Sequence, residues 1–502
     1  MTKIHLYSLA SPLHSEVIPS PADDRFIKDI LSCGGVEFIF HNDFSTWGTF
    51  PSGREVLYIR TGGTEGLFLQ TFFGDEIPSR ATLARNDKDA VISSGPSSVI
   101  PTERQRAEKS HFTLLTSGES NSLAASMEIL SFLRLRGLSG EIIHGTPASV
   151  AARLASLALP STPFPSSKIS PRAPLGRNDK SAVLSSSAVI SSEVEKSLPV
   201  EGAERLLEGV RLGVVGRPSD WLISSDVDYA KARERFGVEI IDISMDELLD
   251  EIRVGGFSIP DAIRLNPLNA PKYGVPFKAG DFDKALEIYG ALSRIVRKYS
   301  LQGLTLRCFD LLGTVGSTGC MALAILNAEG ITATCEGDVP AMVTMAIASR
   351  IAGTPGFQVN LSRIREEGFL FAHCTVPLNI VDNYCYDTHF ESGIGVAVHG
   401  EFSKGPVTLF KVGASMDRFF LAPAILVDNP YANNLCRTQV LLRPAAEASV
   451  SFAGSSAADA SASVAGVAAL ADYFLREPLG NHHVILPGDW VSAIRNNLAW
   501  RP

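Results

Sequence analysis

The stretch Cys335-Glu-Gly-Asp-Val-Pro-Ala-Met-Val-Thr-Met345 places two carboxylates, Glu336 and Asp338, between two regular elements. The apolar run at 331–334 predicts a short buried strand, and 339–351 has the apolar spacing of a helix. The two acids therefore lie on a strand-to-helix turn, and ligands bind at that edge of an open α/β sheet. A carboxylate there can hold a hard cation or take a proton from a substrate carbon. The alternative, which the spacing alone favours, is that Asp338 caps its helix and Glu336 is solvated.

This turn lies in an α/β unit that begins near residue 210. Strands are predicted at 211–216, 238–243 and 304–310, and helices at 246–253, 281–299 and 319–328. Asp310 ends the third strand, one crossover helix before the strand that leads to Glu336. Because strands joined by a single crossover helix are usually neighbours, we expect Asp310 and Asp338 at one edge of one sheet.

Residues 1 to about 160 alternate strand-like and helix-like runs, which predicts an earlier α/β domain with a parallel sheet. Strands are expected at 36–40, 56–60 and 112–116, and a helix at 122–136. The turn Thr61-Gly-Gly-Thr-Glu65 directly follows a strand, and its glycines either let a ligand approach the backbone or form a simple tight turn. It is not a dinucleotide fingerprint, because the G-x-G-x-x-G pattern is absent there.

A repeat interrupts this first domain. The sequence RATLARNDKDAVISS at 80–94 recurs as RAPLGRNDKSAVLSS at 172–186. Two separated copies are too few for a solenoid, and both are rich in Ser, Pro and charge. We expect surface inserts near 79–110 and 163–199, the second also serving as a linker. The alternative is an arm that binds a partner protein.

The last third predicts a mostly antiparallel β-domain, because short strands are punctuated by Gly, Pro and Asp. Strands are expected at 369–375, 395–400, 407–412, 418–427 and 438–443, and a helix at 463–475. The expected fold class is α/β, with two Rossmann-like α/β domains at 1–205 and 206–355 and a β-rich domain at 356–502. Near the end, His482 and His483 are adjacent in a strand, so only one of them can face a given site.

The composition limits the class of protein. The 502 residues are 45% hydrophobic and 20% charged, which fits a globular protein of about two or three domains. The formal net charge of −9 argues against nucleic acid or an anionic membrane as a partner. Seven cysteines without clustered spacing predict neither a disulfide framework nor a structural zinc site. Together with an N-terminus that reads as a strand and not a signal peptide, this favours the cytoplasm.

Several segments resemble the L-fucose isomerase family. Residues 336–345 look like its Glu-x-Asp-(x)6-Met segment, and Asn481-His482-x-Val484 resembles its Asn-His-x-Val metal histidine. Arg307-Cys-Phe-Asp310 lies where that family has its other metal carboxylate. Segments 216–224 and 373–377 also look like segments of the family's shorter members. The resemblance covers about residues 210–502, and the first third matches only in its α/β character.

The resemblance implies an aldose–ketose isomerase that uses Mn²⁺, or another divalent cation such as Mg²⁺ or Co²⁺. By this analogy the metal ligands are Asp310, Asp338 and His482. Asp338 would also move a proton between C1 and C2 of an open-chain sugar, through a cis-enediol. Asp310 departs from the Glu that is usual in the family, so Glu336 is the substitute candidate for its catalytic role.

The resemblance also implies substrate contacts and an assembly. His373 and Trp221 are expected to contact a small sugar substrate, and the alternative for His373 is a core histidine. The family forms oligomers whose active sites draw on a neighbour's N-terminal domain, so we expect a trimer or hexamer in which Thr64 and Glu65 contact another subunit's substrate. Two alternatives remain. One is a paralogue that binds a sugar without isomerising it, and the other is a lyase or epimerase with the same metal-enediol chemistry.

Overall fold

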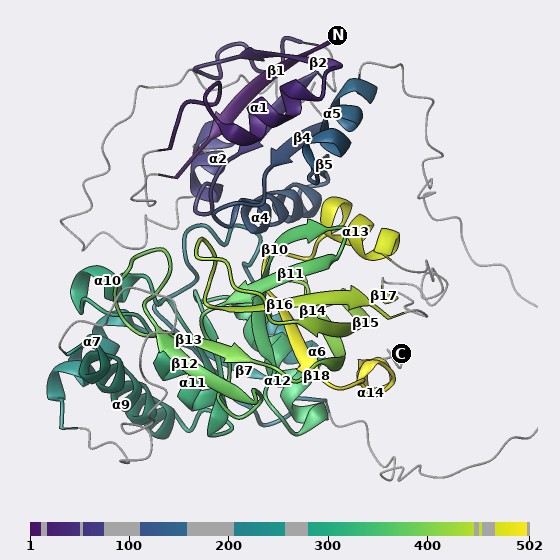
Figure 1. Ribbon diagram of the computed structural model, residues 1–502. Coiled ribbons are helices and arrows are strands. Elements are labelled where there is room, and N and C mark those ends of the chain that lie inside the picture. The colour runs from purple at the N-terminus through teal and green to yellow at the C-terminus, as the bar shows by residue number, and fades with distance from the viewer. Residues whose placement is uncertain are drawn as a thin grey trace, which may run out of the picture.

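The computed structural model describes residues 1–11, 18–50, 54–74, 111–157, 205–256, 280–445, 451–453 and 467–498 (Figure 1). The repeated segments that we expected as surface inserts, near 79–110 and 163–199, lie outside the described residues. No helix in these described ranges combines the length and the apolar character needed to cross a membrane.

The N-terminal part is a parallel sheet with helices on both faces, as expected. Its strands are β1 (Thr2–Leu9), β2 (Val36–Phe40), β3 (Glu55–Ile59), β4 (His111–Thr116) and β5 (Ser139–Ile143), in the spatial order β2-β1-β3-β4-β5. Its helices are α1 (Arg25–Ser32), α2 (Glu65–Phe72), α4 (Ser122–Leu135) and α5 (Pro147–Ser156). Apolar residues of α1 and α5 share one buried cluster, while those of α2 and α4 belong to another. Both faces of the sheet are therefore covered.

The second parallel sheet has four strands in the order β7-β6-β8-β9. They are β6 (Arg211–Val215), β7 (Glu239–Ile243), β8 (Gly303–Leu306) and β9 (Thr332–Cys335). The helices of this part are α6 (Tyr229–Phe236), α7 (Met245–Val254), α9 (Asp281–Tyr299), α10 (Asp310–Thr314), α11 (Cys320–Ala328) and α12 (Val339–Ala352).

One strand boundary in this sheet was predicted wrongly. The strand expected at 304–310 ends at Leu306, which pairs with Cys335, the last residue of β9. Because the chain turns after Cys335, residues 307–310 have no partner there, and Asp310 begins α10 instead of ending a strand.

The C-terminal part is a closed antiparallel barrel. Its strands are β10 (Phe357–Arg365), β11 (Gly368–His373), β14 (Gly405–Val412), β15 (Phe419–Asp428), β16 (Thr438–Pro444) and β18 (His483–Pro487). They run in the order β14-β18-β10-β11-β16-β15, and β15 pairs with β14 to close the ring. The antiparallel character predicted for this region is confirmed, and β18 begins at His483 in the strand expected around the paired histidines, while β10 was not among the expected strands. Accessory elements are β12 (Asn383–Asp387), β13 (Ala397–Glu401), β17 (Ser451–Ala453), α13 (Val467–Arg476) and α14 (Val491–Leu498).

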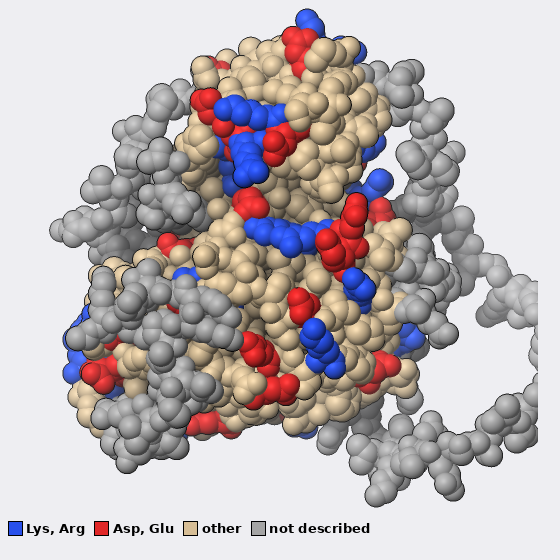
Figure 2. Space-filling model, viewed as in Figure 1, with Lys and Arg blue, Asp and Glu red and all other residues tan. Residues whose placement is uncertain are grey.

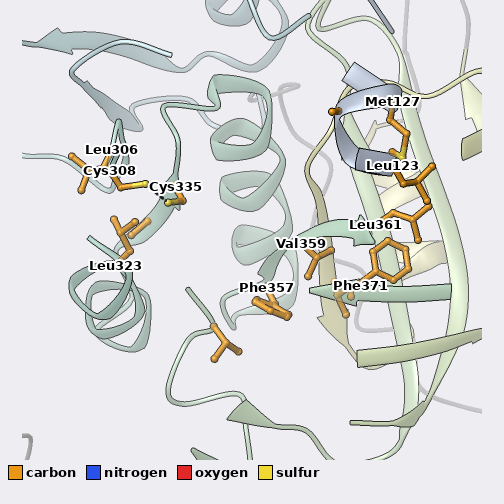
Figure 3. Packing of buried hydrophobic residues seen from close by; sticks show 14 of the residues in the cluster. Leu123, Met127, Leu306, Cys308, Leu323, Cys335, Phe357, Val359, Leu361 and Phe371 are labelled. Carbon is orange, nitrogen blue, oxygen red and sulfur yellow. Dashed lines mark hydrogen bonds between the residues drawn. The ribbon is translucent and has the colours of Figure 1, made fainter. Parts of the chain in front are cut away.

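Helix α4 joins the N-terminal part to the barrel. Its residues Leu123 and Met127 belong to the same buried cluster as Leu361 of β10 and Phe371 of β11 (Figure 3). At the end of this contact, the Ser131 hydroxyl donates to the Pro478 carbonyl at 2.7 Å. The N-terminal part therefore packs directly beside the segment that leads into β18.

Charges of both signs are interspersed over the face of the molecule shown in Figure 2. Ion pairs also join the N-terminal part to the C-terminal part of the fold. Arg363 of β10, for example, pairs with Glu119 of the N-terminal part at 2.6 Å. All seven cysteines are free thiols, and six of them are buried.

Candidate metal site and substrate pocket

The turn after β9 has an unusual backbone. Glu336 has φ +66° and Gly337 has φ +70°, both in the left-handed region. A side chain at position 337 would clash with the carbonyl oxygen of Arg217, so only glycine fits there. The Glu336 carbonyl accepts the Ser219 N–H at 2.9 Å. For a non-glycine residue this conformation costs about 1–2 kcal/mol, and such strain is typical of functional sites.

Three buried side chains converge on this turn. Oε1 of Glu336 lies 3.3 Å from Nε2 of His482 and 3.8 Å from Nε2 of His373. One potential ligand atom from each of the three residues lies within 4.8 Å of the other two. We call Glu336, His373 and His482 the ligand group. A carboxylate and two imidazoles in this arrangement could bind a divalent metal ion.

Each imidazole of the ligand group is fixed from behind. Nδ1 of His482 donates to Oδ2 of Asp338 at 2.8 Å, and Nδ1 of His373 contacts the Thr375 hydroxyl at 2.9 Å. Both rings therefore direct Nε2 toward Glu336. Nε2 of His482 is buried and has no hydrogen-bond partner. Metal-binding histidines typically have such a partner on the second ring nitrogen, so the residues present fit a metal ion.

The charges of the ligand group are mutually dependent. Burial would lower the pKa of His482, but Glu336 and Asp338 raise it to about 10. Burial would raise the pKa of Glu336, but His482 and His373 hold it below its ordinary value. Both carboxylates thus favour the protonated form of His482, and a metal ion would compete with a proton for this imidazole.

Asp338 lies behind His482 and not in the pocket. It is fully buried, and its Oδ1 accepts the Ala341 N–H at 2.8 Å as the N-cap of α12. The Lys411 ammonium lies 3.8 Å from its Oδ2. The helix-cap alternative is therefore correct for Asp338, whereas the alternative of a solvated Glu336 is wrong, since Glu336 is only 9% exposed.

The structure does not bring Asp310 to this group. Its side chain is 41% exposed and accepts from Nε of Arg307 at 2.9 and 3.0 Å. The expected strand end was the reason to place it beside Asp338, and that strand stops four residues earlier. Glu336, and not Asp310, belongs to the group of side chains that could hold a metal ion.

A pocket of about 120 Å³ opens in front of Glu336. Trp221 lies on its wall and donates from Nε1 to Oε2 of Glu336 at 2.6 Å, so this expected substrate contact lies in the pocket. All three parts of the fold line the pocket: Gly62, Gly63, Glu65, Asn121, Ala124, Ala125, Trp221, Phe309, Leu312, Glu336, Asn360, Glu391, Ser392 and Asn481.

Of the two N-terminal residues expected at the substrate, Glu65 lines the pocket and Thr64 does not. The Thr64 hydroxyl donates to the Thr61 carbonyl at 3.0 Å within the turn. Glu65 is 2% exposed, and burial, with the nearby charges of Glu128, Glu336 and Glu391, raises its pKa well above the ordinary value. This residue comes from the same chain as Glu336, whereas we had expected a neighbouring subunit to supply it.

Two buried charges that support the site were missed from the sequence. Glu128 of α4 accepts the Ser224 N–H at 2.6 Å and the Asn481 N–H, next to His482, at 3.0 Å. Lys411 of β14 is also fully buried, and it faces Asp338. A signal existed for both, because each is a charged residue flanked by apolar residues in a helix or strand, and such charges are rarely buried without a partner.

The chain is similar to known sugar isomerases over part of its length. It is 28% identical over 184 residues to the sulfoquinovose isomerase of Clostridium sp. (strain MSTE9), covering 33% of this chain and 39% of that protein. It is 22% identical over 244 residues to the sulfoquinovose isomerases of Priestia aryabhattai and Priestia megaterium, covering 45% of this chain and 53% of theirs. The chain thus spans about half the length of these relatives or less. No family model matches it. The similarity supports a relationship to sugar isomerases.

Proposed function

We propose that this protein is a metal-dependent aldose–ketose isomerase of the L-fucose/L-arabinose isomerase type. One observation carries the proposal. Two imidazoles, each fixed at Nδ1, present Nε2 to a single carboxylate oxygen of Glu336 at the wall of a pocket. The partial similarity to sugar isomerases supports the same class of reaction.

Glu336, His373 and His482 would hold the cation, and Mn²⁺ or a similar divalent ion suits this mixed set of oxygen and nitrogen ligands. Bound there, the cation would supply Lewis acidity toward the sugar's carbonyl and hydroxyl oxygens. His373, expected from the sequence as a substrate contact, is assigned here to the ligand group.

The reaction moves a carbonyl from C1 to C2 through a cis-enediol and needs a carboxylate that carries a proton between the two carbons. We assign this transfer to Glu336, because it faces the pocket and the Trp221 N–H holds one of its oxygens. We assign Glu65 to substrate binding, and Asp338 to positioning His482 from behind.

The test is ketose formation from a panel of aldoses by the Mn²⁺-loaded protein. We expect turnover of at least one aldose, its loss with a chelator, and its recovery when Mn²⁺ is returned. Glu336→Gln should lower kcat/KM by at least about 10²–10⁴-fold, because it removes both the proton carrier and a carboxylate ligand of the cation. Glu141→Gln is the matched control, since Glu141 pairs with Arg153 at 2.7 Å and does not line the pocket.

Two outcomes would refute the isomerase. Sugar binding without ketose formation from any aldose would favour the sugar-binding paralogue. Cleavage or epimerisation of a sugar, again without ketose, would favour a lyase or an epimerase.

A further inference from the structure

Glu65 is a buried carboxyl group in the pocket that has no positive partner. It begins α2, is 2% exposed and lines the pocket together with Glu336. Its Oε2 has no hydrogen-bond partner, and no Lys, Arg or His among the described residues forms an ion pair with it. An ionised carboxylate without a positive partner is very costly to bury, so this environment favours the neutral, protonated group.

The charged groups around Glu65 act in the same direction as burial. They are the carboxylates of Glu128 on α4, of Glu336 after β9 and of Glu391 in the loop between β12 and β13. Burial raises the pKa of Glu65 well above its ordinary value, and these three carboxylates add to that change. A hydrogen bond from its own backbone N–H opposes the change without reversing it. Glu65 is therefore suited to hold a proton and to donate it.

Glu336 has a different environment in the same pocket. Its Oε2 accepts the Trp221 N–H at 2.6 Å, and its Oε1 faces the imidazoles of His373 and His482. Donors that bond to the charged form of a carboxyl group favour that form. The pocket thus holds one carboxyl group whose surroundings favour the carboxylate and another whose surroundings favour the acid. Such a pair is expected where an acid and a base work on one substrate.

We propose that Glu65 is a second catalytic residue, which moves a proton between two oxygens of the substrate while Glu336 moves a proton between two carbons. The inference deepens the proposed function, since it rests on isomerisation at C1 and C2. Conversion of an aldose to a ketose needs both transfers, because the oxygen on C1 gains a proton and the oxygen on C2 loses one.

The step is balanced without a co-reactant. Glu336 takes the proton from C2, the C1–C2 double bond forms, and Glu65 gives its proton to the oxygen on C1. The Glu65 carboxylate then takes the proton from the hydroxyl on C2 as the new C2 carbonyl forms, and Glu336 returns its proton to C1. Both carboxyl groups end in the form in which they began.

The first test is Glu65→Gln in the Mn²⁺-loaded full chain. Glutamine keeps the size and an N–H donor but cannot release a proton, so kcat and kcat/KM should both fall by about 10²–10⁴-fold with little change in KM. Mn²⁺ affinity, measured by calorimetry, should stay at the wild-type value, because Glu65 is not in the ligand group. Glu141→Gln, outside the pocket, should keep the wild-type kcat. A wild-type kcat in Glu65→Gln would show that Glu65 donates only a hydrogen bond, and would overturn the inference.

The second test does not depend on turnover. The infrared difference between the wild type and Glu65→Gln at pH 7 should contain the C=O stretch of a protonated carboxyl group, both with and without Mn²⁺. The difference between the wild type and Glu141→Gln should lack this band. Its absence from the Glu65→Gln difference would show that Glu65 is ionised, and would overturn its role as an acid.

Glu65→Ala provides a third test, which also decides the matter if Glu65→Gln does not fold. This variant removes the carboxyl group and leaves space for a small carboxylic acid. Added formate should raise its kcat/KM by about 10-fold or more, because it replaces the missing proton carrier. A residue with only a structural role would not be replaced in this way, so no response to formate would count against proton transfer by Glu65.

The outcomes separate this inference from the proposed function. Ketose formation by the wild type, with an unaffected Glu65→Gln variant, would refute the role of Glu65 and leave the isomerase intact. Absence of ketose from any aldose with the wild type would instead refute the isomerase, and the proton transfer by Glu65 would fall with it.

Discussion

The orientation of the His482 and His373 rings depends on the groups that their Nδ1 atoms contact. The Asp338 carboxylate and the Thr375 hydroxyl hold the two rings, so that both Nε2 atoms face Glu336. A metal-binding histidine needs an unprotonated nitrogen in a fixed direction, and the group on the other nitrogen sets both. The affinity of this site should therefore depend on residues that do not touch the metal.

Replacing Asp338 with Asn tests this dependence. The asparagine oxygen must stay at Ala341 N–H to cap α12, so its amide nitrogen would face Nδ1 of His482, donor against donor. We expect Mn²⁺ affinity, measured by calorimetry, to fall by about 10–100-fold.

The control is Asp228→Asn, which makes the same change at the exposed N-cap of α6. Asparagine is a good N-cap, so this variant should bind Mn²⁺ like the wild type. Equal affinities for all three proteins would show that Asp338 does not position His482.

At this scale, the sequence offered Glu336, His373 and His482 as candidates because each lies in a short motif. It assigned their roles differently, however, since the choice between Asp310 and Glu336 depends on where β8 ends. That end depends on the turn in its partner strand. Glu128 and Asn481 could not be paired from the sequence, because their contact joins the N-terminal part to the far end of the chain.

The turn between β9 and α12 is the element that directs Glu336. Two consecutive residues with positive φ reverse the chain, and the second of them packs against the backbone at Arg217. The pattern of a strand followed by a helix predicted this turn. The contact that makes glycine obligatory at 337 is with a distant loop, and no local pattern records it.

Gly337→Ala tests the turn. Gly353, the C-cap of α12, has nearly the same φ, +67° against +70°, but nothing lies within 4 Å of its missing side chain. Gly353→Ala should therefore cost only the backbone strain, about 1 kcal/mol of unfolding free energy. Gly337→Ala adds a clash and should cost more than about 3 kcal/mol, besides weakening Mn²⁺ binding. Urea unfolding measures both, and equal losses would contradict this account.

At the scale of the whole molecule, several contacts join the N-terminal part to the barrel. His144, just after β5, is one of them. Its Nδ1 donates to the Thr116 carbonyl at 3.1 Å, and its Nε2 accepts the Ile364 N–H of β10 at 3.1 Å. Only the neutral ring can make both bonds. Burial lowers the pKa of His144 to about 4.

A pH dependence follows from His144. Its pKa is about 4 in the folded chain and about 6.5 when unfolded, so the unfolded state binds the proton first. The contribution of neutral His144 to the free energy of unfolding is fully present above pH of about 6.5. It is lost as the pH falls toward 4, and the loss reaches up to about 3 kcal/mol. Urea unfolding between pH 7 and 4 should show this loss in the wild type and less of it in His144→Gln.

The control is His111→Gln, because His111 bonds Ser139 within the N-terminal part. The free energy of unfolding of this variant should fall between pH 6.5 and 4 as steeply as that of the wild type. A His144→Gln protein with the wild-type slope would exclude His144 as the source.

The sequence predicted the parallel sheets and the antiparallel strands of the last third, because these depend on local periodicity. It did not predict the closure of the barrel, nor that one chain supplies both Glu65 and Glu336 to one pocket. Both depend on packing between segments that are far apart, such as α4 against β10.

Strand β18 lies between β14 and β10, although it follows both of them in the chain. On the ribosome, β10 to β16 are made first and can form only an open sheet with two unpaired edges. His482 directly precedes the strand that closes it, and emerges from the ribosome with that strand. A growing chain therefore acquires its full ligand group and a sealed barrel in the same late step of translation, and every shorter nascent chain lacks both.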